Sequence, residues 1–183
     1  MKLLIASDIH GSLRYCRELL DAFDREQAER LLLLGDLLYH GPRNDLPEQY
    51  APKEVITALN ERKNAILCVR GNCDTEVDQM VLEFPILADY ALVYAETYRL
   101  YATHGHVYHP YHLPPLQKGD VLLQGHTHIP AWETHDGVVC LNPGSVSIPK
   151  DGSLHSYMIL QNGVFEWKTL DGTVFHTWEG TEA

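Results

Sequence analysis

The stretch from Leu3 to Gly11, LLIASDIHG, joins a short apolar run to an aspartate, a histidine and a glycine. A continuous apolar run of this length is typical of a strand that is buried on both faces, as in a parallel sheet. In α/β sheets the functional residues follow the carboxyl ends of the strands. The stretch therefore predicts a buried strand that delivers Asp8 and His10 to one edge of a sheet.

The same pattern recurs four times along the chain, with a small residue and a candidate ligand after each apolar run. The later copies are LLLLGD (31–36), AILCVRGNCD (65–74), RLYATHGH (99–106) and VLLQGHTH (121–128). Each contains a glycine, the residue that best tolerates a sharp turn or a close approach of backbone to a ligand. We therefore expect five loops to converge on one site.

Helical patterns separate the first three of these strands. Apolar residues from Leu13 to Phe23 recur at helical spacing after Ser12, which is a suitable N-cap, and Pro52 can open a second helix. The first half of the chain therefore predicts the order β-α-β-α-β.

The second half of the sequence has a different residue pattern. From Tyr90 onward the chain is mostly strand-like, with Asn162-Gly163 and Asp171-Gly172 as hairpin turns. The proline-rich segment 109–120 is the one long loop, and we expect it to lie over the site. Together the two halves predict an α/β fold, a sandwich of two sheets with flanking helices and antiparallel hairpins at the C-terminus.

The composition fits one globular domain over residues 1–183, because 45% hydrophobic residues are enough for a sizeable core. The 14 lysines and arginines against 25 acidic residues give a net charge of -11, which repels polyanions and argues against nucleic-acid binding. The apolar run at the N-terminus is too short for a signal peptide or a membrane span. We expect a cytoplasmic protein without membrane contact.

The polar residues that follow the apolar runs form a set of potential metal ligands. In Asp-x-His and His-x-His, alternate side chains of an extended segment can aim at a common site. Oxygen and nitrogen donors in this number exceed the needs of one tetrahedral ion and suit two ions that share a bridging carboxylate. The set consists of Asp8, His10, Asp36, Asn72, His104, His126 and His128.

Taken singly, these residues also have ordinary structural explanations. Asp36 could cap a helix, Asn72 could form a turn, and a lone histidine in an apolar setting is usually a hydrogen-bonded core residue. The metal-site interpretation depends on the residues occurring together and in order.

The ordered motifs resemble those of the calcineurin-like metallophosphoesterases. The motifs are Asp8-Ile9-His10, Gly35-Asp36, Gly71-Asn72-Cys73-Asp74, His104-Gly105-His106 and Gly125-His126-Thr127-His128. Longer segments such as SDIHGS, GDLLYHGPRN and LNPGSVSIPK are similar to the small bacterial phosphodiesterases of the YfcE type. The resemblance covers most of residues 1–150, and each motif is weak alone but specific in this order. It implies a four-layer αββα sandwich.

The resemblance also implies a metal-dependent phosphodiesterase that acts on a small phosphodiester. It assigns Asp8, His10, Asp36 and His128 to one divalent ion, and Asp36, Asn72, His104 and His126 to the other. Asp36 would bridge the two ions, which can hold a hydroxide and the phosphate oxygens for an in-line displacement. Oxygen and imidazole ligands without a thiolate favour manganese, although zinc, iron, nickel or cobalt suit the same set.

Cys73 departs from the family pattern. A tyrosine-phosphatase-like nucleophile needs an arginine six residues on, where this chain has Gln79. A thiolate ligand would have to replace Asn72, and neighbours in an extended segment point in opposite directions. Many relatives carry histidine here, paired with the next acid, which is Asp74 in this chain. Cys73 therefore either packs as a buried thiol or occupies the place of a general acid, with His106 as the candidate replacement.

Arg43, in the loop after Asp36, is a candidate contact for a phosphate oxygen, although a loop arginine is often only solvated surface. The aromatic segment 164–178, VFEWKTLDGTVFHTW, is where we expect chains to associate if the protein forms a homo-oligomer.

Two alternative functions stay open at this stage. The same site could serve a phosphomonoesterase or nucleotide phosphatase, because the choice between mono- and diester depends on the shape of the pocket. The fold could also serve as a non-catalytic scaffold, as in the metallophosphoesterase-like subunit of the retromer sorting complex.

Overall fold

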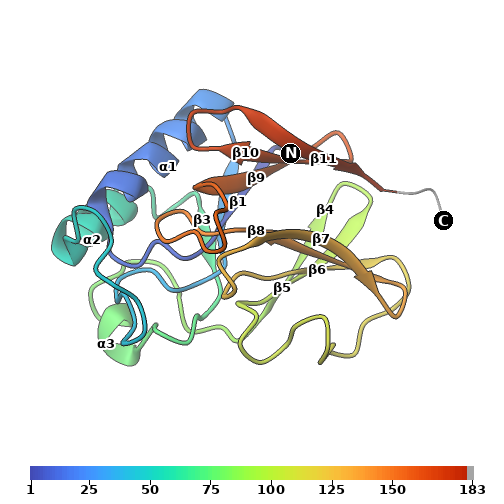
Figure 1. Ribbon diagram of the computed structural model, residues 1–183, viewed down its shortest axis with the longest axis horizontal. Coiled ribbons are helices and arrows are strands. Elements are labelled where there is room, and N and C mark those ends of the chain that lie inside the picture. The colour runs from blue at the N-terminus through green and yellow to red at the C-terminus, as the bar shows by residue number, and fades with distance from the viewer. Residues whose placement is uncertain (181–183) are drawn as a thin grey trace.

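The computed structural model describes residues 1–180 and contains two β-sheets packed face to face, with helices outside one of them (Figure 1). The predicted apolar runs form β1, β2, β3, β5 and β6, in the order expected from the sequence. The fold is therefore built around the recurring pattern of strand, small residue and polar loop.

The six-stranded sheet has the order β11-β10-β9-β1-β2-β3. Its strands are β1 (Leu3–Ala6), β2 (Arg30–Leu33), β3 (Ile66–Cys68), β9 (Ser156–Gln161), β10 (Val164–Thr169) and β11 (Val174–Glu179). β1, β2 and β3 pair in parallel, so their carboxyl ends meet at one edge. β9, β10 and β11 pair as antiparallel hairpins, and Asn162-Gly163 has the positive φ angles of a tight hairpin turn, as predicted.

The five-stranded sheet has the order β4-β5-β6-β8-β7. Its strands are β4 (Ala91–Ala95), β5 (Tyr98–Ala102), β6 (Asp120–Leu123), β7 (Pro130–His135) and β8 (Val138–Pro143). β5, β6 and β8 are parallel neighbours and also end at a common edge. β7 is not evident in the sequence, because it is a largely exposed edge strand that begins with proline and lacks a buried face.

The helices α1 (Leu13–Glu26) and α2 (Pro52–Asn60) cover the outer face of the six-stranded sheet, and the short α3 (Glu76–Gln79) follows β3 (Figure 1). The Ser12 side chain accepts a hydrogen bond from the Tyr15 amide and caps α1, while Pro52 occupies the first turn of α2. Both predicted helix starts are confirmed.

Strand β1 is buried on both faces, which explains its continuous apolar run. Leu4 and Ala6 face the helices, whereas Leu3 and Ile5 face the core between the two sheets. Burial on both sides fixes the position of the strand, and therefore of the polar loop that follows it.

The outer face of the five-stranded sheet is covered by loop 105–119 within the described part of the chain. Tyr108, Leu113 and Leu116 of this loop pack against Tyr101 and Leu122 of the sheet. The predicted sandwich of two sheets with flanking helices and C-terminal hairpins is confirmed, and this loop supplies the layer outside the second sheet.

No helix within residues 1–180 is both long enough and apolar enough to cross a membrane. β11 forms one edge of the six-stranded sheet, with Val174 and Phe175 exposed to solvent. Association of chains through this segment stays a prediction.

Candidate metal centre

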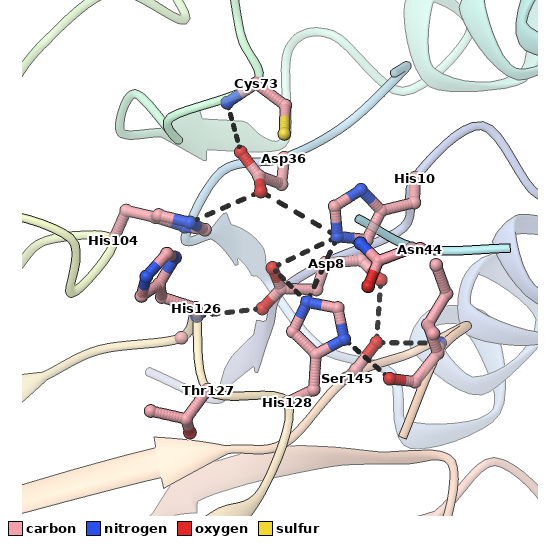
Figure 2. Close-up of polar contacts among 12 residues, drawn as sticks. Asp8, His10, Asp36, Asn44, Cys73, His104, His126, Thr127, His128 and Ser145 are labelled. Carbon is pink, nitrogen blue, oxygen red and sulfur yellow. Dashed lines mark hydrogen bonds and ion pairs between the residues drawn. The ribbon is translucent and has the colours of Figure 1, made fainter. Parts of the chain in front are cut away.

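Five loops meet at the carboxyl ends of β1, β2, β3, β5 and β6, and they carry the residues predicted to bind metal (Figure 2). Several of these residues have left-handed backbone conformations, with φ of 62° at Asp8, 49° at His10, 56° at Asp36, 65° at His126 and 63° at His128. Such conformations are unfavourable for residues with a side chain, and they cluster at functional sites where the surroundings impose them.

Glycines allow the loops to approach one another closely. A Cβ atom on Gly71 would overlap the Asp36 side chain, and one on Gly125 would overlap the Ser7 side chain. The backbone is also tied together, since the His10 amide donates to the Asp36 carbonyl at 2.9 Å and the His126 amide donates to Asp8 Oδ2 at 3.1 Å. The side chains are therefore held in place by the loops that carry them.

Backbone carbonyls orient three of the histidines. The Nδ1 atoms lie 2.7 Å from the Tyr39 carbonyl for His10, 2.7 Å from the Leu34 carbonyl for His104, and 2.6 Å from the Ile148 carbonyl for His128. A carbonyl can only accept, so each Nδ1 carries a proton and Nε2 is the nitrogen that faces the site. Metal-binding histidines are typically oriented in this way.

Asp8, His10 and His128 form the first group of close donors. The Nε2 atoms of His10 and His128 are 3.2 Å apart, and Asp8 Oδ1 lies 3.5 Å and 3.3 Å from them. Two unprotonated nitrogens at this distance repel each other unless a cation or an extra proton lies between them. The buried Oδ1 atom also has no hydrogen-bond partner within the described chain. This donor set fits a divalent metal ion.

Asp36 connects the first group to a second one. Its Oδ2 atom lies 3.7 Å from His10 Nε2 and 3.4 Å from His104 Nε2, while Asn72 Oδ1 lies 3.1 Å from the same His104 nitrogen. The ring of His126 lies 5.1 Å from that of His104, but its ring nitrogens are outside the closest groups of donors. The second set therefore has one predicted donor, His126, whose nitrogens lie outside the close group.

The charges at the site also fit bound cations. Burial raises the pKa of a carboxyl group, yet the imidazoles of His10 and His128 hold the pKa of Asp8 well below its usual range. Burial lowers the pKa of an imidazole, yet the carboxylate of Asp36 raises the pKa of His104 to about 9. Within residues 1–180, no lysine or arginine forms an ion pair with Asp8 or Asp36. In the absence of metal, a proton on His104 provides positive charge that a metal ion would otherwise supply.

His126 is in a different environment. Burial and the neighbouring His104 lower the pKa of His126 to about 4, so its imidazole is neutral at pH 7. A neutral imidazole is the form that binds metal. His126 is therefore prepared to be a ligand, although its nitrogens do not converge with the others in this structure.

The expectation that Asn72 and Cys73 point in opposite directions is wrong. The segment after β3 is a turn, not an extended strand, and Asn72 Nδ2 lies 3.3 Å from Cys73 Sγ. Cys73 Sγ also lies within 4.8 Å of ligand atoms of His10 and Asp36. Burial and the Asp36 carboxylate raise the pKa of Cys73 to about 12, so the thiol stays protonated at neutral pH.

Asp74 is buried and points away from the donor cluster. Its two oxygens accept hydrogen bonds from the backbone amides of Asp36 at 2.8 Å, Leu37 at 2.9 Å and Gly71 at 2.7 Å. This arrangement ties the loop after β2 to the loop after β3. Asp74 therefore positions Asp36 in the structure, and a direct part in catalysis stays a prediction.

The other predicted site residues lie around the donors. Arg43 and Asn44 line a small cavity of about 40 Å³ next to His10, Asp36 and Asn72. Exposed His106 lies beside the second group, with its ring 5.4 Å from that of His104. His135, His155 and His176 belong to none of the donor groups, and the ring of His176 stacks on that of Trp132 with 3.6 Å between centroids.

Sequence reasoning assigned no role to the loop after β8, although it supports the site. The hydroxyls of Ser145 and Ser147 donate to the Asp8 carbonyl at 2.9 Å and 3.0 Å, and Asn142 Nδ2 donates to the Gly125 carbonyl at 2.8 Å. Lys150 from the same loop lines the small cavity together with Arg43. The run of small polar residues directly after a buried strand was the available signal.

Comparison with known proteins agrees with this geometry. The sequence model of the calcineurin-like phosphoesterase superfamily domain matches residues 1–162. Phosphodiesterase YfcE of Escherichia coli strain K12 is 52% identical over 164 residues, which cover 90% of this chain and 89% of that protein. A solved structure of YfcE from E. coli, described as a phosphoesterase, matches with a TM-score of 0.94 at 49% identity, covering 97% of this chain and 98% of that one.

The wild-type Vps29 of Entamoeba histolytica in complex with zinc matches with a TM-score of 0.59 over 97% of this chain and 98% of that one. At 20% identity this likeness concerns the fold alone. The family match and the curated relative decide the identity: the chain belongs to the calcineurin-like phosphoesterase superfamily and is a phosphoric ester hydrolase.

Proposed function

We propose that this chain is a phosphodiesterase that hydrolyses small phosphodiesters with two divalent metal ions. Asp8, His10 and His128 hold one ion, Asn72, His104 and His126 hold the other, and Asp36 bridges them. The observation that carries the proposal is the orientation of three histidines by backbone carbonyls, so that their Nε2 atoms surround two carboxylates that no lysine or arginine within residues 1–180 neutralises.

Bound divalent ions would supply Lewis acidity and activate water near neutral pH. The protein's own residues do the rest. The cationic groups of Arg43 and Lys150 line the small cavity and can pair with phosphate oxygens. Asp74 holds the Asp36 loop in register through its three backbone hydrogen bonds. The site thus binds an anionic phosphoryl group and fixes its orientation.

The proton for the leaving group comes from His106 in this proposal. Cys73 is a weak donor, because its raised pKa makes the thiol slow to release a proton. His106 is exposed and lies on the rim of a larger cavity that adjoins the site. Esters with stable leaving groups, such as aryl phosphates, should therefore react best.

Two features favour a diester over a monoester. The relative YfcE is named a phosphodiesterase. The larger cavity, of about 460 Å³, shares His126 with the metal centre and leaves room for a second ester substituent. For the metal, we propose manganese, because carboxylate and amide oxygens mix with imidazole and no thiolate is required.

The test is the initial rate of hydrolysis of bis(4-nitrophenyl) phosphate and of 4-nitrophenyl phosphate by metal-stripped protein. Manganese, zinc and magnesium are added back singly, and metal content is measured in parallel. We expect manganese-dependent diester hydrolysis that exceeds monoester hydrolysis. A preference for the monoester would favour a phosphatase, and tight metal binding without hydrolysis of either ester would favour a scaffold.

A further inference from the structure

Two of the proposed metal ligands, His126 and His128, lie in a strained loop, residues 125–129, that follows β6. The Thr127 amide donates to the Gly125 carbonyl at 2.7 Å across His126, whose φ is 65°. A turn closed in this way around a residue with positive φ is a γ-turn of the rare, strained kind. His128 also has a left-handed backbone, with φ of 63°. Such conformations persist only where the surrounding contacts impose them.

One buried side chain, that of Asn142 on β8, holds the first half of this loop. Its Nδ2 atom donates to the Gly125 carbonyl at 2.8 Å and to Thr127 Oγ1 at 3.0 Å. Its Oδ1 atom accepts from the Gly144 amide at 2.8 Å. A side-chain amide nitrogen carries two hydrogens, so both are used on the two residues that flank His126.

The Thr127 hydroxyl extends this support to the second histidine. Its Oγ1 atom accepts from the Ile129 amide at 3.3 Å and donates to the Ile129 carbonyl at 3.4 Å. The Thr127 side chain points away from Asp8, whereas the His128 ring points toward it (Figure 2). Thr127 therefore connects the turn at His126 to the left-handed backbone at His128, on the side away from the metal donors.

The position of Asn142 does not depend on the loop that it supports. β8 lies between β6 and β7 in the five-stranded sheet, and the Asn142 carbonyl accepts from the indole of Trp167 at 2.7 Å. Trp167 is fully buried on β10 of the opposite sheet. Asn142 is thus held by the core between the two sheets, and the loop is held by Asn142.

We propose that Asn142 is a positioning residue of the metal centre. Through Gly125 and Thr127 it imposes the strained loop that turns His126 toward one ion and His128 toward the other. The inference rests on the proposed two-metal site, and it adds to that site a residue that touches neither metal nor substrate. When these hydrogen bonds are removed, relief of the backbone strain should offset part of their loss. Metal affinity should therefore fall while the stability of the metal-free fold changes little.

The first experiment measures metal binding, by calorimetric titration of manganese into metal-stripped protein. Thr127→Val removes the hydroxyl of an exposed residue at similar size, Thr127→Ser keeps it, and Thr134→Val makes the same change on an exposed residue of β7. Asn142→Asp keeps the size and the acceptor but removes both donors. We expect the Kd to rise about tenfold in Thr127→Val and about a hundredfold in Asn142→Asp. Thr127→Ser and Thr134→Val should stay within about twofold of the wild type.

The second experiment separates positioning from a general effect on stability. Urea unfolding of the metal-free proteins should give Thr127→Val a midpoint close to that of the wild type. Electron paramagnetic resonance of the manganese-loaded proteins should show an exchange-coupled pair in the wild type and isolated ions in Asn142→Asp. If Asn142→Asp does not fold, the comparison of Thr127→Val with Thr127→Ser decides the matter alone.

The outcomes distinguish this inference from the proposed function. Two bound ions whose Kd depends on Thr127 and Asn142, without hydrolysis of either ester, would refute the phosphodiesterase function and leave the positioning role standing. Ester hydrolysis with a Kd for manganese that Thr127→Val leaves unchanged would overturn the positioning role alone. So would a lower urea midpoint of metal-free Thr127→Val without any change in its Kd.

Discussion

The buried metal centre and a half-buried cluster of charged side chains at the end of α1 differ in how their carboxylates are neutralised. At the metal centre, Asp8 and Asp36 lie within 4 Å of histidine nitrogens and form no ion pair with a lysine or arginine within the described chain. At the end of α1, Glu26 accepts from Lys2 at 2.7 Å, from Lys168 at 2.9 Å and from the Tyr157 hydroxyl at 3.0 Å. Lysines neutralise the carboxylate of the second cluster, whereas the carboxylates of the first cluster are suited to bind added cations.

The difference separates a functional cluster from a structural one. Carboxylates paired with lysines connect α1 to β10 and need no ligand. Buried carboxylates without a lysine or arginine partner destabilise the fold unless metal ions or protons on the surrounding imidazoles neutralise them. The left-handed backbone at the metal centre adds to that cost, and no such residue occurs in α1 before its C-cap, Gln27.

The largest expected effect comes from removing the carboxylate shared by both donor groups. Asp36→Ala should lose both metal ions and at least about 10³-fold in kcat, because each ion then loses the carboxylate that it shares with the other. Metal content by mass spectrometry and diester hydrolysis measure the effect. Glu26→Gln is the matched control, a half-buried carboxylate changed elsewhere, and should keep metal and activity. An active Asp36→Ala protein loaded with two metals would refute the bridge.

Metal removal should reveal the instability of the empty cluster. With free metal at about 100 times its Kd, each ion stabilises the folded state by about 2.7 kcal/mol, and a chelator removes this contribution. We expect the midpoint of urea unfolding to fall on chelation in the wild type and in Glu26→Gln. Asp36→Ala should be unaffected by the chelator. An equal fall in the urea midpoint of all three proteins on chelation would show that the chelator does not act on stability through the metal centre.

The Glu26 cluster should show its contribution through pH. Burial would raise the pKa of Glu26, but Lys2, Lys168 and the Tyr157 hydroxyl lower it to about 2, below the ordinary value of 4.5. Its stabilisation is therefore fully present above pH 4.5 and lost as pH falls through about 2. We expect Glu26→Gln to cost about 1 kcal/mol at pH 7, a modest value because the pair is partly screened by solvent.

Urea unfolding of the metal-free protein at pH 7, 4.5 and 3 measures this effect. The wild type and Glu26→Gln should converge in stability as the pH falls. If the free energies of unfolding of the wild type and of Glu26→Gln change in parallel with pH, ionised Glu26 does not interact more strongly with its neighbours than the protonated form does. Glu61, an exposed acid at the C-terminal end of α2 that forms no ion pair within residues 1–180, provides a control through Glu61→Gln.

Much of this architecture follows from the sequence. The apolar runs before Asp8 and Asp36 are continuous because their strands are buried on both faces, so the strands and the loops after them could be placed. The Asn162-Gly163 hairpin was equally clear, since its turn needs positive φ at both positions.

The rest depends on contacts between distant segments. The turn that brings Asn72 beside Cys73, the three amides that converge on Asp74 and the hydrogen bonds from Asn142 to the loop after β6 arise only when separate strands are assembled. Strand β7 was missed because an exposed edge strand carries no periodic burial. Sequence patterns thus locate ligands along the chain, while their orientation comes from tertiary packing.

The smallest expected effect concerns the proton donor. Cys73 lies beside Asp36 and His10, where an imidazole could donate a proton that the thiol, with a pKa of about 12, releases poorly. Cys73→His should raise kcat/KM a few-fold for alkyl aryl phosphodiesters whose phenolate is a poor leaving group, and little for those with the best leaving groups. Cys73→Ser, which offers a hydroxyl of similar size and no better acid, is the control. A rate change of equal size across a series of substituted phenyl leaving groups would mean that position 73 acts on binding or metal geometry. The rate falls as the pKa of the leaving phenol rises. If this dependence of log kcat/KM on leaving-group pKa becomes weaker only in Cys73→His, position 73 is a place where a general acid can act.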